Sequence, residues 1–104
     1  MREKVVGTTF RTHPDVASFA GTIDNTGEIP VFTGRAILMP EPTNEYDTNA
    51  IAVVAEMKDG KTHHLGYCAK NGEFYTTVTN PTLVTLRIYG YSTIGLSDSF
   101  QIEN

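Results

Sequence analysis

The residues with the clearest chemical potential lie in one polar stretch, EPTNEYDTN, at positions 41–49. Within it, Tyr46 and Asp47 place an aromatic ring beside a carboxylate, which when ionised accepts hydrogen bonds and donates none. Such a pair can present a stacking surface and an acceptor to a partner. The same short polar side chains can instead bond to their own backbone and fix the loop, so both interpretations stay open.

A second group of reactive side chains, His63, His64 and Cys68, lies close together in the chain. Neighbouring residues of a strand point to opposite faces, so His63 and His64 should diverge, whereas His64 and Cys68 should share a face. No CxxC pair completes four zinc ligands, and His13 would have to arrive from elsewhere. We predict no metal and no cofactor, and keep a metal-dependent hydrolase as the last of three alternatives.

The sequence has no motif typical of an enzyme. It has no Walker loop, no dinucleotide-binding glycine pattern and no GxSxG elbow. Its one cysteine, Cys68, falls in an apolar segment, where cysteine usually serves as a small buried hydrophobe. Glu41 and Asp47 could pair as acid and base, but the sequence does not separate that role from loop capping. We therefore predict a protein that is not an enzyme.

Composition restricts the class of protein and of partner. The 104 residues are the size of a single domain, 1–104, and one cysteine excludes an internal disulfide. No apolar run approaches the roughly 20 residues that span a bilayer, and the first residues do not resemble a signal peptide, so we expect a cytoplasmic protein without a membrane contact. The net charge of −4 argues against broad binding of duplex DNA but permits a small, end-specific contact.

Short strands must position these residues. Pro40 and Pro42 end the strand before the polar stretch, and Asp59-Gly60 is typical of a hairpin turn. Short helices are predicted near Asp15–Ala20 and Asn71–Val78, and turns at Asp24–Gly27 and Ser92–Ser97. Strands are predicted over Arg2–Arg11, Arg35–Met39, Ala50–Ala55, His63–Cys68, Leu83–Tyr91 and Phe100–Ile102.

These elements predict a mainly β fold. The best match is a small OB-like or SH3-like β-barrel of about six strands with one or two short helices, because closure of a barrel removes exposed strand edges. The region His13–Gly34 is expected to be irregular, since Gly and Pro interrupt it. Phe10, at the end of the first strand, is expected in the core, as is usual for an aromatic residue.

Three segments of the chain together resemble a known family. The first is VVGTTF at 5–10, and the third is LGY at 65–67, followed by Lys70. The second, EPTNEYDTNAIAV at 41–53, is long and specific, and matches the pattern EPxNxYDxNAIxV. In this order, and spanning about Val5 to Phe74, they resemble a HIRAN domain, a small module found at the N-terminus of certain SNF2-type DNA-remodelling helicases and as free-standing bacterial proteins.

The resemblance implies an OB-like barrel that binds the 3′-hydroxyl end of single-stranded DNA, in DNA repair or replication-fork processing. In that family the Tyr of the NxYD step stacks on a base and the following Asp accepts the terminal hydroxyl, which maps to Tyr46 and Asp47. The resemblance implies four further residues. Phe10 would pack against the terminal nucleotide, and Asn44 would orient the loop. Tyr67 stands where some members have a His that reaches the DNA, and Lys70 would contact phosphate.

A non-DNA alternative also stays open. The first strand has Thr9 and Phe10 where DNA-binding members can carry Arg and Tyr, and the chain is acidic. These departures favour an interaction or structural protein that binds a protein partner or itself, with the polar loop serving only the architecture.

Overall fold

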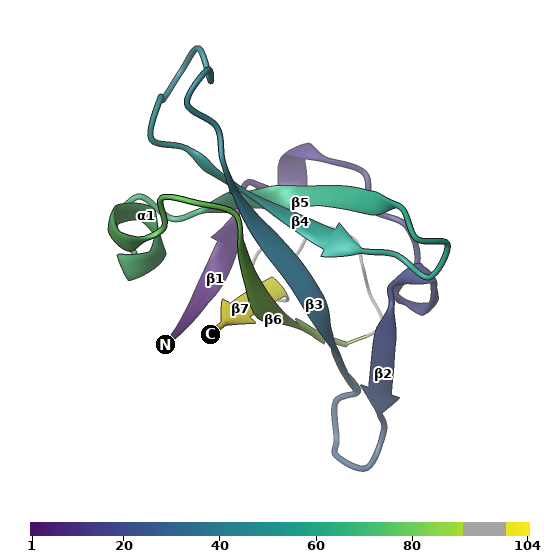
Figure 1. Ribbon diagram of the computed structural model, residues 1–104. Helices are drawn as coiled ribbons and strands as arrows, with labels where there is room; N and C mark the ends of the chain where they lie inside the picture. Colours follow the sequence, from purple (N-terminus) through teal and green to yellow (C-terminus); the bar gives the residue numbers. More distant parts are fainter. Residues whose placement is uncertain (91–99) are drawn as a thin grey trace.

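The computed structural model describes residues 1–90 and 100–104, and these residues form short strands with a few helical turns (Figure 1). The helical turns are η1 (Thr8–Phe10), η2 (Val16–Ser18) and α1 (Glu73–Thr77). The strands are β1 (Arg2–Val6), β2 (Gly21–Asp24), β3 (Val31–Pro40), β4 (Ile51–Glu56), β5 (Thr62–Cys68), β6 (Thr82–Tyr89) and β7 (Phe100–Glu103).

The strands pair antiparallel in the order β2-β3-β4-β5-β1-β7-β6, and β3 also pairs with β6. This last pairing closes β3, β4, β5, β1, β7 and β6 into a barrel, while β2 extends the sheet outside the ring (Figure 1). The predicted six-stranded barrel with short helices is therefore confirmed. Among the described residues, no helix is long and apolar enough to cross a membrane.

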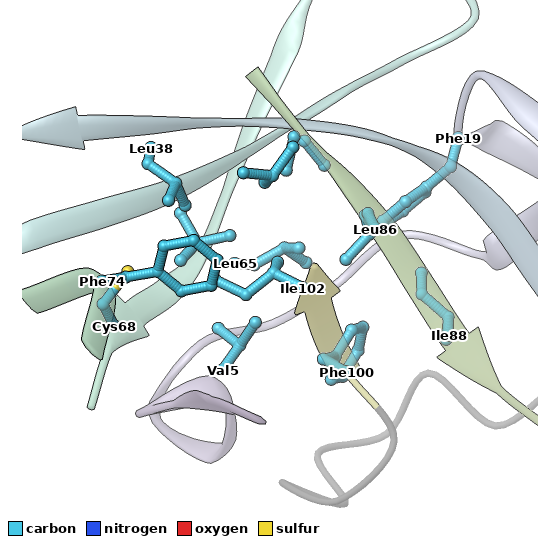
Figure 2. Packing of buried hydrophobic residues seen from close by; sticks show 14 of the residues in the cluster. Val5, Phe19, Leu38, Leu65, Cys68, Phe74, Leu86, Ile88, Phe100 and Ile102 are labelled. Carbon is cyan, nitrogen blue, oxygen red and sulfur yellow. The ribbon is translucent and has the colours of Figure 1, made fainter. Parts of the chain in front are cut away.

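Apolar side chains from all six strands of the ring fill the barrel (Figure 2). Phe19, which follows η2, and Phe74 of α1 lie at opposite ends of this cluster, and the exposed fraction of each is 2% or less. Burial of side chains this large stabilises the fold by about 2–3 kcal/mol each. Phe19 thus holds η2 against the core, and Phe74 holds α1 against it.

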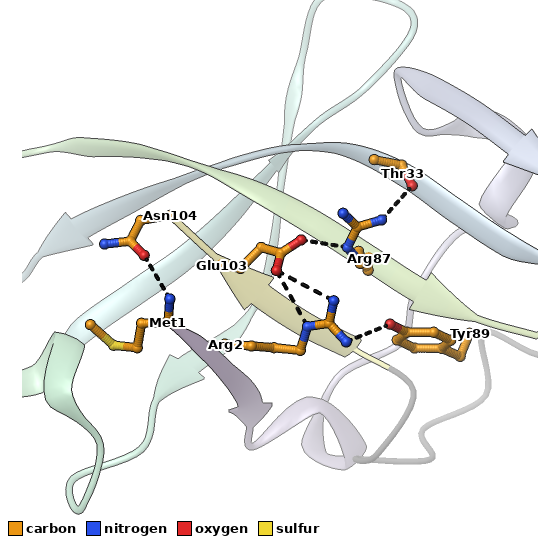
Figure 3. A network of polar contacts seen from close by, with 7 residues as sticks. All are labelled: Met1, Arg2, Thr33, Arg87, Tyr89, Glu103 and Asn104. Carbon is orange, nitrogen blue, oxygen red and sulfur yellow. Dashed lines mark hydrogen bonds and ion pairs between the residues drawn. The ribbon is translucent and has the colours of Figure 1, made fainter.

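A charged network crosses the strands that complete the ring (Figure 3). Arg87 Nε donates to Glu103 Oε1 at 2.6 Å, and Arg2 Nε donates to Glu103 Oε2 at 3.4 Å. Arg87 also donates to Thr33 Oγ1 at 3.2 Å. The network therefore links β1, β7, β6 and β3, and the hydrogen bond from Arg87 is the main reason that the pKa of Glu103 is lowered.

The first strand is shorter than predicted, and Phe10 is not in the core. Gly7 has a φ of 75°, which lies in the left-handed region that glycine adopts readily, and the chain turns there into η1. The turn carries Phe10 out of the sheet, where its side chain is 89% exposed. The prediction of a buried Phe10 was wrong because it assumed that the strand continued to Arg11.

Regular structure also replaces part of the region expected to be irregular. β3 begins at Val31 rather than Arg35, and β2 pairs with it so that Gly21 lies opposite Gly34. A Cβ atom on either glycine would overlap the ring of Phe32. These glycines are therefore strand residues that make room for an aromatic ring, not breaks in the strands. The predicted helical turn near Asp15 is confirmed as η2, while the predicted turn at Ser92–Ser97 lies outside the described residues.

β5 contains an extra residue relative to β4. Val53 of β4 pairs with Gly66, and its neighbour Val54 pairs with His64, so Leu65 of β5 has no partner residue on β4. This bulge reverses the alternation, so that His64 faces outward against the Tyr67 ring whereas Cys68 is buried in the core. The expectation that His64 and Cys68 share a face was wrong, because it assumed a strand without a bulge.

Two histidines form a hydrogen-bonded pair beside this strand. His13 Nε2 lies 2.7 Å from the carbonyl oxygen of Thr8, which can only accept, so this nitrogen carries a proton. His13 Nδ1 lies 2.8 Å from His63 Nε2, so one of these two nitrogens donates to the other. Burial lowers the pKa of His63, and the positive charges that His13, His64 and Arg11 can carry lower it further.

We predict that stability falls as the pH drops below about 6.5, the value at which an unperturbed histidine titrates. Because the pKa of His63 is lower in the folded protein, the unfolded chain binds more protons in this range, and the free energy of unfolding decreases. Urea unfolding at a series of pH values measures this, and a His63→Gln variant should lose part of the slope. If the free energy of unfolding of the variant depended on pH as steeply as that of the wild type, His63 would not be the source of this pH dependence.

A second prediction concerns Gly66. A Cβ atom there would overlap the backbone carbonyl oxygen of Val6 on the adjacent strand, so Gly66→Ala must push β1 and β5 apart. We expect the free energy of unfolding to fall by about 1–3 kcal/mol, the usual effect of overpacking. Gly27→Ala, where the nearest atom would be 3.9 Å away, is the matched control and should change stability little.

Candidate functional site

The polar stretch forms a loop, 41–50, that projects from the barrel between β3 and β4 (Figure 1). A backbone hydrogen bond closes its base, from Glu41 N to Ala50 O at 2.9 Å, and another, from Ala50 N to Asp47 O at 3.0 Å, closes a turn within the loop. Pro40 and Pro42 lack the N–H that would extend the pairing of β3 and β4 into the loop. The loop is therefore joined at its ends and must be shaped by its own side chains.

Asn44 sets the conformation of this loop. Its Oδ1 accepts from the backbone N–H groups of Tyr46 at 2.9 Å and of Asp47 at 3.0 Å. Its Nδ2 donates to Glu41 Oε1 at 3.0 Å, so both ends of the amide are engaged. As a result the Tyr46 side chain points into solvent, with 90% of its surface exposed.

The carboxylate of Asp47 is held from several sides. Its Oδ1 accepts from the backbone N–H of Asn49 at 2.9 Å, and its Oδ2 accepts from the Tyr75 hydroxyl at 2.8 Å. The ammonium group of Lys70 lies 3.8 Å from Oδ2. The Asn49 N–H is the largest cause of a lowered pKa for Asp47, followed by the Tyr75 hydroxyl. The group is therefore ionised at neutral pH.

Tyr67 is joined to the loop and supports a cation. Its hydroxyl donates to Glu41 Oε1 at 2.9 Å, and its ring contacts His64 edge-on, with centroids 4.9 Å apart. The guanidinium of Arg11 lies 5.7 Å from the centre of the same ring, within the range of a cation–π contact. Burial is the main reason that the pKa of Tyr67 is raised, with the Glu41 bond second.

These side chains line one groove with a volume of about 430 Å³. Five of the six residues implied by the resemblance line it, namely Asn44, Tyr46, Asp47, Tyr67 and Lys70. These five residues come from two separate parts of the chain. The polar loop supplies the first three, and β5 with the turn after it supplies Tyr67 and Lys70. The sixth residue, Phe10, does not line the groove. It is exposed, and the residue that follows it, Arg11, does line the groove.

Besides apolar and small lining residues, sequence reasoning missed two residues of this groove that carry polar groups, Arg11 and Tyr75. Arg11 was assigned to the end of the first strand, and Tyr75 to the short helix predicted near Asn71–Val78. The available signal was local: Arg11 directly follows the first matching segment, which ends at Phe10, and Tyr75 directly follows Phe74, where the span of the resemblance ends. With Lys70, Arg11 gives the groove two cationic lining residues in a chain whose net charge is −4.

A neighbouring groove of about 320 Å³ lies beside the first and shares Ala50 and Tyr75 with it. Its lining is made of prolines, small apolar residues, threonines and an asparagine, and no lining residue is charged. Arg11, Asp47 and Lys70 line the first groove instead, and we place the candidate site there.

Metal and thiol chemistry have little support in the described part of the chain. Within residues 1–90 and 100–104, no cluster of three or more His, Cys, Asp or Glu side chains could hold a metal ion. Cys68 is buried, and burial raises the pKa of its thiol to about 12, which leaves very little of the nucleophilic thiolate at neutral pH. Cys68 and His64 also face opposite sides of β5, so they form no dyad.

Comparison of the chain with protein-family models, with curated proteins and with solved structures finds no match in any of the three.

Replacement of Asn44 by alanine tests how the loop is held. Asn44→Ala leaves the N–H groups of Tyr46 and Asp47 without their acceptor, so we expect hydrogen exchange at both amides to accelerate by about tenfold or more. The free energy of unfolding should fall by about 1 kcal/mol. In the control Asn80→Ala, which removes one bond to Thr79 Oγ1, exchange in the loop should not change. Unchanged exchange in Asn44→Ala would mean that the loop is held by other contacts.

Proposed function

We propose that this protein is a non-enzymatic module that binds the 3′-hydroxyl end of single-stranded DNA, as its resemblance to HIRAN domains implies. The observation that carries the proposal is the exposed ring of Tyr46, 90% accessible, directly beside the ionised carboxylate of Asp47 at one groove. By the same resemblance, the process it serves is DNA repair or replication-fork processing.

Tyr46 supplies the stacking surface. A ring held at the tip of a rigid loop loses little freedom when a base stacks on it, because the Asn44 bonds already fix its backbone. Stacking of a base on an aromatic side chain is worth about 1–3 kcal/mol and tolerates any base. Phe10, which is exposed and directly precedes the lining residue Arg11, offers a second apolar surface for the terminal nucleotide.

Asp47 supplies the selectivity for an end. An ionised carboxylate repels an internal phosphate, but it accepts a hydrogen bond from a free hydroxyl. Because the bonds from Asn49 and Tyr75 lower the pKa of Asp47, it keeps this charge below neutral pH. One acidic group thus lets the site bind the last nucleotide of a strand in preference to nucleotides within the strand.

Arg11 and Lys70 supply the attraction for the phosphate backbone. Both line the groove, and the side chain of Lys70 is 74% exposed. Arg11 sits over the Tyr67 ring, which the Glu41 bond holds in place, so Tyr67 acts as a platform for this cation. Two phosphate contacts on single-stranded DNA correspond to a shallow salt dependence, with a slope of about −1.4 in log K against log salt.

An oligonucleotide titration tests the proposal. A short single strand with a free 3′-hydroxyl should bind at least about tenfold more tightly than the same strand with a 3′-phosphate, because the phosphate meets Asp47. Tyr46→Ala should weaken binding of both strands about tenfold through lost stacking, and Asp47→Asn should reduce the difference between them.

Ile29→Ala is the control for these variants. Ile29 is an apolar residue, 59% exposed, in the turn after β2 at the opposite end of the molecule from the polar loop (Figure 1). Its loss should leave binding of both strands unchanged. Equal affinity of the wild type for the two ends, or no binding of either, would overturn the proposed function.

A further inference from the structure

The groove has two walls that come from different parts of the fold. The loop wall carries Tyr46 and Asp47, from the loop between β3 and β4. The platform wall is the Tyr67 ring on β5 with the Arg11 guanidinium 5.7 Å from the ring centre. A nucleotide that stacks on Tyr46 while Arg11 binds its phosphate contacts both walls at once. Binding of such a ligand therefore depends on how the two walls are placed relative to each other.

One carboxylate oxygen joins these walls. Oε1 of Glu41 accepts from the Tyr67 hydroxyl at 2.9 Å and from Asn44 Nδ2 at 3.0 Å. The other end of the same amide, Asn44 Oδ1, accepts from the backbone N–H groups of Tyr46 and Asp47. A chain of hydrogen bonds thus runs from the Tyr67 ring, through Glu41 and Asn44, to the backbone of the loop wall.

Glu41 is itself well fixed. Its backbone N–H donates to Ala50 O at 2.9 Å, and its carbonyl oxygen accepts from Asn44 N at 3.0 Å. The side-chain bond from Asn44 is the largest cause of a lowered pKa for Glu41, and the bond from Tyr67 lowers the pKa as well. The carboxylate is therefore ionised at neutral pH, and an ionised acceptor makes stronger hydrogen bonds than a neutral one.

We propose that Glu41 is a positioning residue of the site, which holds the loop wall and the platform wall in one fixed relative placement. Glu41 does not line the groove, so its effect on a ligand passes through Tyr67 and Asn44. The bond from Tyr75 to Asp47 joins the loop wall to α1 and not to β5. Without Glu41, a ligand would have to order the two walls as it binds, which costs affinity. This inference rests on the proposed function.

Glu41→Gln and Glu41→Ala together test the proposal. Both substitutions remove one negative charge whose field reaches Arg11, so the effect of charge on DNA binding is the same in both. Only glutamine keeps an oxygen that can accept from Tyr67 and Asn44. We expect the strand with a free 3′-hydroxyl to bind Glu41→Ala about fivefold more weakly than Glu41→Gln. Equal affinity of the two variants would overturn the proposal.

Tyr67→Phe separates the joining of the walls from an effect within the loop. It removes the hydroxyl that bonds to Glu41 but leaves the bond between Glu41 and Asn44. In this background the Gln and Ala substitutions at position 41 should differ by less than about twofold in affinity, because the link to β5 is already lost. If the fivefold ratio persisted, Glu41 would act only through the loop, and the proposal would be wrong.

Glu45 offers the matched control. It carries the same charge and lies in the same loop, but it is exposed and does not line the groove. Glu45→Gln and Glu45→Ala should bind the strand equally well. A fivefold ratio at this position too would mean that any alanine in the loop weakens binding, which would overturn the role of Glu41. Urea unfolding shows that each variant is folded under the conditions of the titration.

A measurement without DNA separates this inference from the proposed function. The ring current of Tyr67 shifts the NMR signals of the Arg11 side chain, and this shift should persist in Glu41→Gln and decrease in Glu41→Ala. If it does so but the wild type binds no strand, the proposed function fails and the positioning by Glu41 stands. If the wild type prefers the 3′-hydroxyl to the 3′-phosphate, but the shift or the affinity is equal in both variants, the positioning is overturned and the proposed function stands.

Discussion

The geometry of the site depends on one side chain that bonds to its own loop. Asn44 Oδ1 accepts from two consecutive backbone N–H groups, those of Tyr46 and Asp47, while its Nδ2 donates to Glu41. A loop between two strands would otherwise have these N–H groups in water and many conformations. With them satisfied, the Tyr46 ring projects outward and the Asp47 carboxylate turns toward α1. The loop is therefore both architectural and free to present its ring, and the two interpretations do not exclude each other.

The site also shows how an acidic chain can hold a local cluster of cations. The net charge is −4, yet Arg11 and Lys70 both line the groove. Exposed charges farther apart than about 10 Å are largely screened at ordinary ionic strength, so a ligand in the groove responds mainly to Arg11, Lys70 and the nearby carboxylates Glu41 and Asp47, and less to the rest of the chain. The Asp47 carboxylate owes its lowered pKa mainly to hydrogen bonds, from Asn49 and then Tyr75, with Lys70 contributing less. Net charge is thus a poor guide to a contact of this size.

Most of the fold follows from patterns that act over a few residues. Alternating or continuous apolar runs predicted the positions of six strands, and Asp59-Gly60 predicted the hairpin of β4 and β5, where Gly60 has a φ of 83°. The errors arose where a tertiary contact overrides the local pattern. Gly21 and Gly34 read as breaks, but they make room for the Phe32 ring, and the bulge in β5 becomes visible only against the register of β4.

The sequence by itself determined the polar loop, because the bonds that shape it join residues no more than three apart in the chain. Only the tertiary structure decided which other side chains meet that loop. Tyr75 reaches Asp47 from a distance of 28 residues, since the core holds Phe74, and Arg11 reaches the Tyr67 ring because Gly7 turns the chain out of β1. Such contacts arise when the barrel closes, and no periodicity within a single segment encodes them.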